Sequence, residues 1–212
     1  MESRNELVLK ESFNNLRNKK VILIGAGGAA NFLLPLLTKF PLKLTIFDGD
    51  LIEESNLERQ IFFTKIDVGK NKAEVLSTKF DVNPVPVFVT KDNIHELIKL
   101  KPDLVIDCTD NFKFRKLILN NYKTNFSWIF SAVSENRGQV YLIDKNEAID
   151  LNPLINKNEV SASNFGVTNY SVALLSSLVS SLCVDFLGKK KKLNTMIRFN
   201  LDDYSFININ LK

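Results

Sequence analysis

The sequence predicts an α/β protein with a mostly parallel sheet, helices on both faces of the sheet, and antiparallel strands that form a hairpin at the C-terminus. Three observations support this prediction. Between residues 19 and 134, short apolar runs alternate with amphipathic helix patterns. Such alternation is typical of parallel strands joined by right-handed crossovers. Residues 195–212 alternate in polarity on either side of a short polar turn, which is typical of a hairpin.

The first half of the chain supplies the parallel part of the sheet. The run at 19–28 is apolar and rich in β-branched residues, as expected for a strand buried on both faces, and the run at 103–110 is also predicted to be a buried strand. Pro35 lies inside the first predicted helix, where it removes one backbone hydrogen bond and predicts a kink. Strands are predicted at 19–28, 42–50, 85–90, 103–110 and 126–134, and helices at 29–40, 69–80, 93–100 and 111–122.

The pattern changes after residue 134. A strand is predicted at 138–144 with no helix before it, and residues 145–166 are polar and irregular. Residues 167–188 predict a long helix that is apolar over much of its surface and therefore buried on several sides. Since no repeat or linker divides the chain, we expect one domain over residues 1–212.

Composition limits the classes of partner. The 212 residues are 45% hydrophobic, which is enough for a substantial core. The net charge of +4 is small, and much of it comes from the lysine run at 189–192. Such a run is typical of a solvated helix end, and no other basic face is visible, so we expect no nucleic-acid partner.

The two cysteines, Cys108 and Cys183, form no CxxC pair, which argues against a disulfide scaffold and against a zinc site built from cysteines. No apolar run reaches the length of a membrane span, and the first residues do not resemble a secretory signal. We therefore expect no membrane partner and a reducing compartment, either the cytoplasm or an organelle interior.

The sequence GAGGAA at 25–30 follows a predicted strand and opens a helix, the context required of a nucleotide-binding loop. Gly25 allows a tight turn, and Gly27 lets the backbone approach a phosphate. The helix N-terminus offers N–H groups to that phosphate. Asp48 ends the next strand, 20 residues beyond Gly28, and could accept hydrogen bonds from ribose hydroxyls. The alternatives at this point are a structural turn and an NAD site.

The stretch DGDLIEESNLERQIFF at 48–63 argues against NAD. It leaves an apolar strand and gathers acidic, amide and arginine side chains before the chain turns apolar again. The chemistry of an NAD-dependent oxidoreductase does not require this cluster of polar side chains. A polar cluster just past a strand end belongs in a crevice at the carboxyl edge of a parallel sheet.

Four blocks, LIGAGGAAN, FDGDLIEESNLERQIFF, DVGKNKAE and VIDCTDNFKFR, occur in this order. Together they resemble the MoeB/ThiF adenylyltransferases and the adenylation domains of ubiquitin-activating enzymes. The resemblance implies a Rossmann-like fold, with a nucleotide-binding half at about 19–134 and a carrier-binding and dimerisation half at about 135–212. It also implies that the protein works as a homodimer.

The same resemblance implies the reaction. The carboxylate of the C-terminal glycine of a small sulfur-carrier or ubiquitin-like protein, which ends in Gly-Gly, attacks the α-phosphate of ATP with Mg²⁺ present. The products are an acyl-adenylate and pyrophosphate. Such a transfer needs positioning and charge neutralisation more than covalent help from the protein.

Most of the site residues implied by the resemblance bind the nucleotide. The glycines of the loop at 25–28 lie beside it, and Asp48 holds the ribose. Asn56 and Arg59 contact the phosphates, Gln60 orients their loop, and Lys72 neutralises phosphate charge.

The remaining implied residues complete the site. Asp110 binds Mg²⁺, so Arg59, Lys72 and Asp110 are the expected catalytic group. Asn111 follows Asp110 at the helix start, where it could instead serve only as an N-cap. Arg4 resembles an arginine that family members lend to the ATP site of the partner subunit.

Two departures from the family pattern are visible. Many members hold a zinc ion with two CxxC pairs, and this chain has neither, so we expect no structural zinc. Some members carry a reactive cysteine before the long helix, but residues 158–166 contain none. We therefore expect the chemistry to stop at the acyl-adenylate.

Several alternatives stay open. The chain could be a non-catalytic scaffold or regulatory paralogue, although it keeps the arginine, lysine and aspartate that such paralogues typically lose. It could adenylate a ribosomal peptide instead of a carrier protein. The long helix at 167–188 could form the dimer interface or lie in the core. The identity of the substrate is not readable from the motifs.

Overall fold

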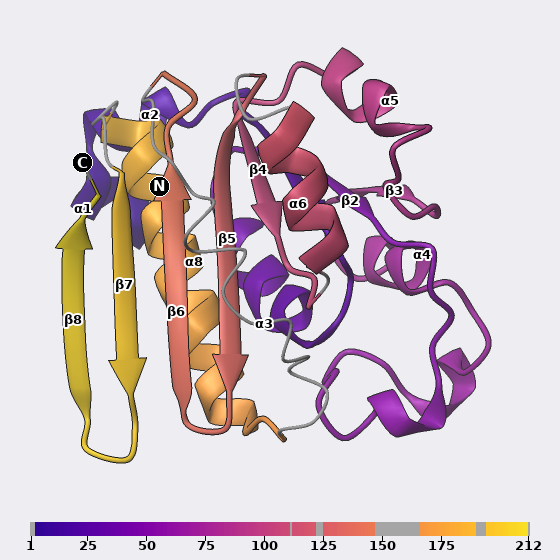
Figure 1. The fold of residues 1–212 in the computed structure, drawn as a ribbon. Coiled ribbons are helices and arrows are strands. Elements are labelled where there is room, and N and C mark those ends of the chain that lie inside the picture. The colour runs from indigo at the N-terminus through magenta and orange to yellow at the C-terminus, as the bar shows by residue number, and fades with distance from the viewer. Residues whose placement is uncertain (1–2, 111, 122–124, 147–165, 190–193, 212) are drawn as a thin grey trace.

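The computed structural model describes residues 3–110, 112–121, 125–146, 166–189 and 194–211 (Figure 1). Its centre is an eight-stranded sheet in the order β3-β2-β1-β4-β5-β6-β7-β8. The strands from β3 to β5 are parallel, and β6, β7 and β8 continue the sheet in antiparallel fashion. The predicted α/β architecture with C-terminal antiparallel strands is confirmed.

The parallel half fixes where a site can form. β1 pairs with both β2 and β4, so the strand order reverses at β1. In open α/β sheets, ligands bind in the crevice at the carboxyl ends of the strands beside such a reversal. The bounds are β1 (Lys20–Ile24), β2 (Lys43–Phe47), β3 (Asn83–Val85), β4 (Leu104–Asp107) and β5 (Ser127–Ser134).

The strand predicted at 85–90 is misplaced. The structure has β3 at Asn83–Val85, at the edge of the sheet, and residues 86–90 lie outside it. Proline has no N–H to donate, so it belongs at sheet edges and strand ends. Pro84 sits in this edge strand and Pro86 follows directly after it, which accounts for the early end.

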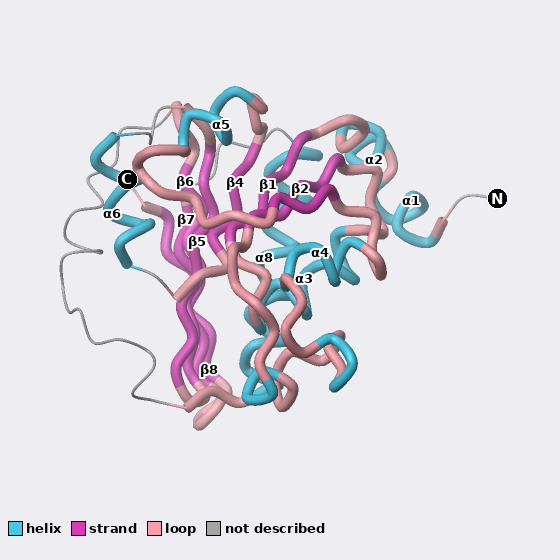
Figure 2. The backbone as a smooth tube through the Cα atoms, turned by 90° about the vertical axis from the view of Figure 1, so that its right-hand side faces the viewer, coloured by secondary structure: helices cyan, strands magenta, loops and turns pink. Residues whose placement is uncertain are grey.

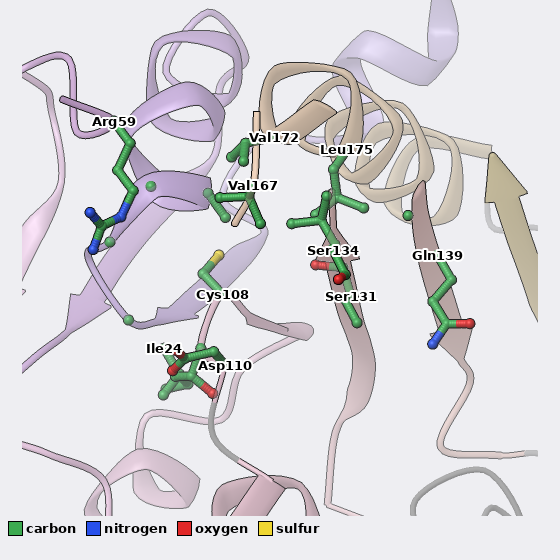
Figure 3. Close-up of a pocket in the computed structure, with 18 of the residues that line it drawn as sticks. Ile24, Arg59, Cys108, Asp110, Ser131, Ser134, Gln139, Val167, Val172 and Leu175 are labelled. Carbon is green, nitrogen blue, oxygen red and sulfur yellow. The ribbon is translucent and has the colours of Figure 1, made fainter. Parts of the chain in front are cut away.

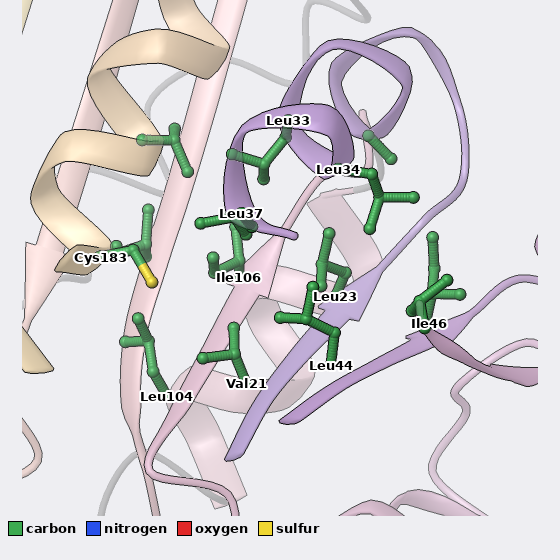
Figure 4. Close-up of a cluster of buried hydrophobic side chains, with 14 of the residues drawn as sticks. Val21, Leu23, Leu33, Leu34, Leu37, Leu44, Ile46, Leu104, Ile106 and Cys183 are labelled. Atoms are coloured by element: carbon green, nitrogen blue, oxygen red, sulfur yellow. The ribbon is translucent and has the colours of Figure 1, made fainter. Parts of the chain in front are cut away.

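Helices cover both faces of the sheet, as predicted (Figure 2). One face packs against α3 and α8, and a buried cluster there includes Leu33 and Cys183 (Figure 4). The other face packs against α5 and α6, with Leu97 and Ile118 in a second cluster. The helices are α1 (Arg4–Leu9), α2 (Glu11–Asn15), α3 (Gly28–Leu37), α4 (Lys72–Ser77), α5 (Ile94–Lys99), α6 (Phe112–Asn121) and α8 (Asn169–Lys189).

The antiparallel half consists of β6 (Arg137–Ile143), β7 (Thr195–Asn200) and β8 (Ser205–Asn210). β7 and β8 form the predicted hairpin. β8 is an edge strand, and every one of its residues is exposed. In Figure 1 no described helix lies in front of β7 and β8, so this face of the hairpin is open among the described residues.

The helix α8 corrects one expectation. By length and composition it could cross a membrane, although no apolar run of that length was expected. However, 61% of its most apolar window is buried, and it packs against α3, β5 and β6. The core helix of a globular domain can have the same length and composition, so the observed packing favours the interpretation that α8 is a core helix.

Candidate functional site

A large pocket opens at the carboxyl ends of β1, β2 and β4, beside the reversal of strand order. Figure 3 shows Arg59 on one side of it and Gln139 on the other, with Cys108 and Asp110 between them. Its volume is about 2030 Å³. Small-molecule sites usually measure about 300–1,000 Å³, so this pocket has room for more than one small ligand.

The structure gathers most of the predicted site residues in this pocket. Arg4 is exposed at the start of α1 and does not line it. Asn111 lies outside the described residues. The predicted residues that line the pocket are Gly25, Gly27, Gly28, Asp48, Asn56, Arg59, Gln60, Lys72 and Asp110.

The glycine loop connects β1 to α3. Gly25 has φ +96°, a conformation that side chains disfavour. A Cβ there would also lie 3.1 Å from Cγ2 of Thr109 and 3.2 Å from the backbone of Cys108. Gly27 caps α3, whose first N–H groups are unpaired within the helix and can receive an anion. Only glycine at position 25 lets β1 turn this closely past the end of β4.

Asp48 lies at the end of β2 and is buried. Its Oδ2 accepts a hydrogen bond from the N–H of Ala26, and its Oδ1 accepts one from the N–H of Asp50 at 2.7 Å. Burial raises the pKa of Asp48 above 3.8, and these two donors oppose the shift. A carboxylate can accept about four hydrogen bonds. Asp48 therefore holds the glycine loop and keeps acceptor capacity for a ligand hydroxyl.

The short helix η1 (Glu54–Asn56) and the turn after it carry the next three predicted residues. Asn56 is buried, and its Oδ1 accepts from the N–H of Glu53 at 3.2 Å. Its carbonyl accepts from the N–H groups of Arg59 and Gln60 at 3.2 and 2.9 Å. Asn56 therefore shapes the turn from which Arg59 and Gln60 reach the pocket.

Arg59 and Gln60 differ in environment. The Arg59 side chain is 39% exposed, and its Nη1 donates to the carbonyl of Ser55 and to the Glu58 carboxylate. Gln60 is 3% exposed, and its Oε1 is buried without a hydrogen-bond partner among the described residues. The Arg59 guanidinium is thus accessible to a ligand, and Gln60 is held beside the glycine loop.

Lys72 begins α4 and is buried, with its Nζ 3.2 Å from Oδ2 of Asp50. The preceding residue, Asn71, caps α4 through a hydrogen bond from the N–H of Glu74. The Asn71 amide also donates to the carbonyls of Asp48 and Asp50 at 2.9 and 3.2 Å. Asn71 was not predicted, although an asparagine just before a helix is the usual signal for a cap. It ties the lysine to the end of β2.

The turn after β4 positions Asp110. Arg115, from α6, donates to Oδ2 of Asp107 at 2.9 Å and to the carbonyls of Thr109 and Ser131 at 2.9 and 2.6 Å. Both members of this ion pair are buried. The pair was not predicted, because an acid inside an apolar strand pattern and a basic residue on a helix do not show that they meet. The exposed Asp110 carboxylate follows from this turn into the pocket.

The other wall of the pocket comes from the antiparallel strands and was also not predicted residue by residue. It includes Ser134, Gln139 and Arg198, and α8 contributes Val172 and Leu175. These residues come from parts of the chain with no motif. The family resemblance implied a carrier-binding half at about 135–212, but it did not indicate these individual side chains.

The two cysteines are free. Burial raises the pKa of the Cys183 thiol to about 12 and also raises that of Cys108, which Asp107 reinforces. A thiolate is the reactive form of cysteine. Both thiols are therefore poor nucleophiles, although Cys108 lines the pocket.

Comparison with known protein families matches residues 3–212 to the ThiF family. The chain belongs to the ThiF family. It is 30% identical over 213 residues to a probable molybdopterin-synthase adenylyltransferase of Porphyra purpurea, covering 92% of this chain and 56% of that protein. It is 35% identical over 117 residues to the sulfur carrier protein adenylyltransferase of Thermus thermophilus, covering 51% of this chain and 42% of that protein.

Solved structures agree with the fold of this ThiF-family chain. E. coli MccB aligns with a TM-score of 0.81 at 21% identity, over 99% of this chain and 69% of that one. PaaA aligns with a TM-score of 0.72 at 17% identity, over 94% of this chain and 66% of that one. Likeness at these identities shows the fold alone. The chain spans about half the length, or less, of the relatives named above.

Proposed function

We propose that this ThiF-family chain is an ATP-dependent adenylyltransferase. It would activate the C-terminal glycine carboxylate of a small sulfur-carrier or ubiquitin-like protein as an acyl-adenylate and release pyrophosphate. One observation supports this most directly: a single pocket at the strand reversal gathers the glycine loop, Arg59, Lys72 and Asp110. The relatives of this family named above are adenylyltransferases, one of them of a sulfur carrier protein.

In this proposal the pocket acts by position and charge. The N-terminus of α3 and the loop glycines would receive phosphate oxygens, and Asp48 would accept from the ribose hydroxyls. Arg59 and Lys72 would neutralise charge on the phosphates, and this kind of stabilisation carries most of the catalysis of such transfers. Since Lys72 is buried beside Asp50, its ammonium is held in place before the nucleotide arrives.

The residues present also fit Mg²⁺. Among the described residues, no group of three or more histidine, cysteine or acidic side chains gathers to bind a metal. Mg²⁺ in nucleotide sites needs only one or two carboxylates, because water and phosphate oxygens supply its other ligands. The exposed Asp110 carboxylate meets that need. When bound there with ATP, Mg²⁺ would neutralise charge on the phosphate oxygens.

A peptide substrate is the second candidate. The fold matches MccB, which has been solved with ATP and also in complex with N-formylated MccA. A carrier tail and a peptide both end in a free carboxylate, so the same chemistry serves both. The homodimer, with Arg4 lent to the partner's site, and the cytoplasmic or organellar location are further parts of this proposal. A monomer in light scattering would contradict the homodimer.

ATP–pyrophosphate exchange tests the proposal. The protein is mixed with Mg²⁺, labelled pyrophosphate and candidate carriers that end in Gly-Gly, beside the variants Arg59→Ala and Asp110→Ala. We expect carrier-dependent exchange that falls about a hundredfold or more in each variant, because each removes charge stabilisation of the transferring phosphate.

Arg17→Ala is the matched control, because Arg17 is exposed and lies outside the pocket. It should exchange like the unaltered chain. If the folded protein binds ATP but shows no exchange with any carrier or peptide, the adenylyltransferase proposal fails and the scaffold alternative gains support.

A further inference from the structure

The pocket wall opposite Arg59 contains a cross-strand row of side chains with an unusual polarity. Ala132 of β5, Gln139 of β6, Arg198 of β7 and Ile207 of β8 are consecutive register partners. Gln139, Arg198 and Ile207 are polar or exposed, and Arg198 and Ile207 belong to the open hairpin of β7 and β8. In the two strands that carry them, Gln139 and Arg198 alternate with Val140 and Phe199, which pack on the α8 side of the sheet. The row therefore lies on the face away from α8.

Arg198 is a cation without a carboxylate in this row. Its Nε donates to Oε1 of Gln139 at 3.3 Å, and it forms no ion pair within the described part of the chain. The neighbouring pocket arginines differ, because Arg137 pairs with Asp202 and Arg115 pairs with Asp107. Arg198 is thus a pocket arginine whose charge the described residues leave unneutralised.

The side-chain groups of Arg198 and Gln139 that have no partner among the described residues are donors. Oε1 of Gln139 accepts from the Tyr141 hydroxyl at 3.2 Å as well as from Arg198. With that oxygen occupied twice, the terminal nitrogens of Arg198 and the Nε2 of Gln139 remain without acceptors among the described residues. Arginine presents a planar fork of donors that matches a carboxylate. An acidic side chain is the group that fits this cluster.

The sheet gives the distance from the reacting end. In β4 and β5, Asp107 pairs with Phe130, so the turn at Thr109 continues toward the row of Ala132 and Arg198. Three strand spacings of about 4.8 Å separate β4 from β7, which is roughly 14 Å. An extended chain advances about 3.3 Å per residue. A substrate whose carboxylate lies beside Asp110 would therefore pass Arg198 about four residues earlier.

We propose that Arg198, with Gln139, selects protein or peptide substrates that carry an acidic residue four or five positions before the C-terminus. This inference rests on the proposed function, because it assumes a C-terminal tail with its carboxylate at the Asp110 end of the pocket. It goes beyond that function by naming a specificity residue and the chemistry that it reads.

Binding of labelled peptides tests this inference without catalysis. The probes are fluorescein-labelled decapeptides that end in Gly-Gly, with Glu, Gln or Lys at the fifth position from the end, and the Kd is measured by anisotropy at low salt. We expect the Glu peptide to bind about two- to fivefold tighter than the Gln peptide, the range for a partly exposed ion pair. The Lys peptide should bind weakest.

Variants identify the residue responsible. Arg198→Gln should remove the preference, and Arg198→Glu should reverse it in favour of the Lys peptide. Arg17→Gln, at an exposed arginine outside the pocket, should keep the order of the unaltered protein. Moving Glu to the ninth position from the end should abolish its advantage, because that residue lies beyond the reach of β7.

Four outcomes would overturn the inference: equal binding of the three peptides, no binding of any, a Glu advantage at every position, or a preference that survives in Arg198→Gln. The same peptides in ATP–pyrophosphate exchange separate this inference from the proposed function. A Glu preference in binding without exchange would count against the adenylyltransferase alone. Rates of exchange that do not depend on the residue at the fifth position from the end would count against the role of Arg198 alone.

Discussion

Two positive-φ glycines show how the same backbone conformation can serve different ends. Gly25 has φ +96° and Gly69 has φ +85°. A Cβ on Gly25 would press against Thr109 and Cys108, whereas a Cβ on Gly69 would meet nothing within 4 Å. Gly69 is therefore needed only for its backbone angle, and Gly25 is needed for its angle and for space.

This difference gives the first stability prediction. Gly69→Ala should cost about 1–3 kcal/mol of unfolding free energy from backbone strain alone. Gly25→Ala should cost more, because the added methyl group also displaces the turn after β4. Urea denaturation measures both, with Gly27→Ala as the control, since Gly27 has a negative φ and its nearest added contact would be 3.9 Å away. Equal losses at Gly25 and Gly69 would show that crowding contributes nothing.

The buried ion pair of Arg115 and Asp107 gives the second stability prediction. Arg115→Met leaves the Asp107 carboxylate buried without its cation, and breaking such a pair typically costs about 3–5 kcal/mol. The double variant Arg115→Met/Asp107→Asn should be more stable than the single one, because the stranded charge is gone. If the double variant instead shows the summed loss of both single variants, the two groups are not coupled.

Sequence predicted the site residues unevenly, for physical reasons. Asp48 and Asp110 stand just past the ends of β2 and β4, where topology brings them together, and Lys72 stands at the start of α4 in a block that carries the family resemblance. Arg198 and Gln139 are 59 residues apart, and only the pairing of β6 with β7 makes them neighbours. Nothing in the local pattern announces a contact of this kind.

At the scale of elements, short helices stabilised by caps hold the polar loop between β2 and α4. The helix η2 (Lys65–Asp67) closes with a capping box in which Asp67 accepts from the N–H and the hydroxyl of Thr64, at 3.0 and 2.8 Å. The Thr64 hydroxyl is the main cause that lowers the pKa of Asp67 below 3.8, with Lys79 and Lys70 also contributing. The loop that leads to Lys72 thus depends on one ionised carboxylate.

The lowered pKa of Asp67 makes the stability of the fold depend on pH. A carboxyl group with a lowered folded pKa stabilises the fold above its unfolded pKa, and this stability is lost as the pH falls through the folded pKa. Asp67→Asn should therefore lower Tm by about 2–4 °C at pH 7. The gap to the unaltered chain should close as the pH falls below 3.8. Asp81→Asn, at an exposed aspartate, is the control. A gap that stays constant down to pH 2 would contradict the role of the ionised carboxylate.

Element types were predicted well and their ends less well. The long helix and the C-terminal hairpin follow from sustained periodicity, and the structure has both. The short helices η1 and η2 were not predicted, because three-residue helices have no periodicity to detect. β3 was misplaced because an apolar run after Pro84 and Pro86 resembles a strand even where proline ends the pairing.

At the scale of the whole molecule, the sheet joins two kinds of architecture. From β3 to β5 it is a parallel sheet with a strand reversal, and from β5 to β8 it is an antiparallel platform. The pocket lies where the two meet, so the residues proposed to bind the nucleotide come from the first part and the facing wall from the second. Alternating patterns predicted both parts, but the pairing of β6 with β7 across the long helix could not be read from any local signal.

The pairing of β6 with β7 has a consequence for the order of folding. The β5–β6 and β7–β8 hairpins close over short turns, whereas β6 meets β7 only after some fifty residues, including α8, have been placed between them. Non-local pairing is slow, since loop closure must come before its contacts form. We expect pulsed hydrogen exchange to show amides between β5 and β6 protected before those between β6 and β7. Simultaneous protection would mean that the two hairpins form as one cooperative unit. If β6 pairs with β7 late, the pocket wall that carries Arg198 is among the last surfaces of a newly made chain to form. The chain could not select a substrate tail through Arg198 before that pairing is complete.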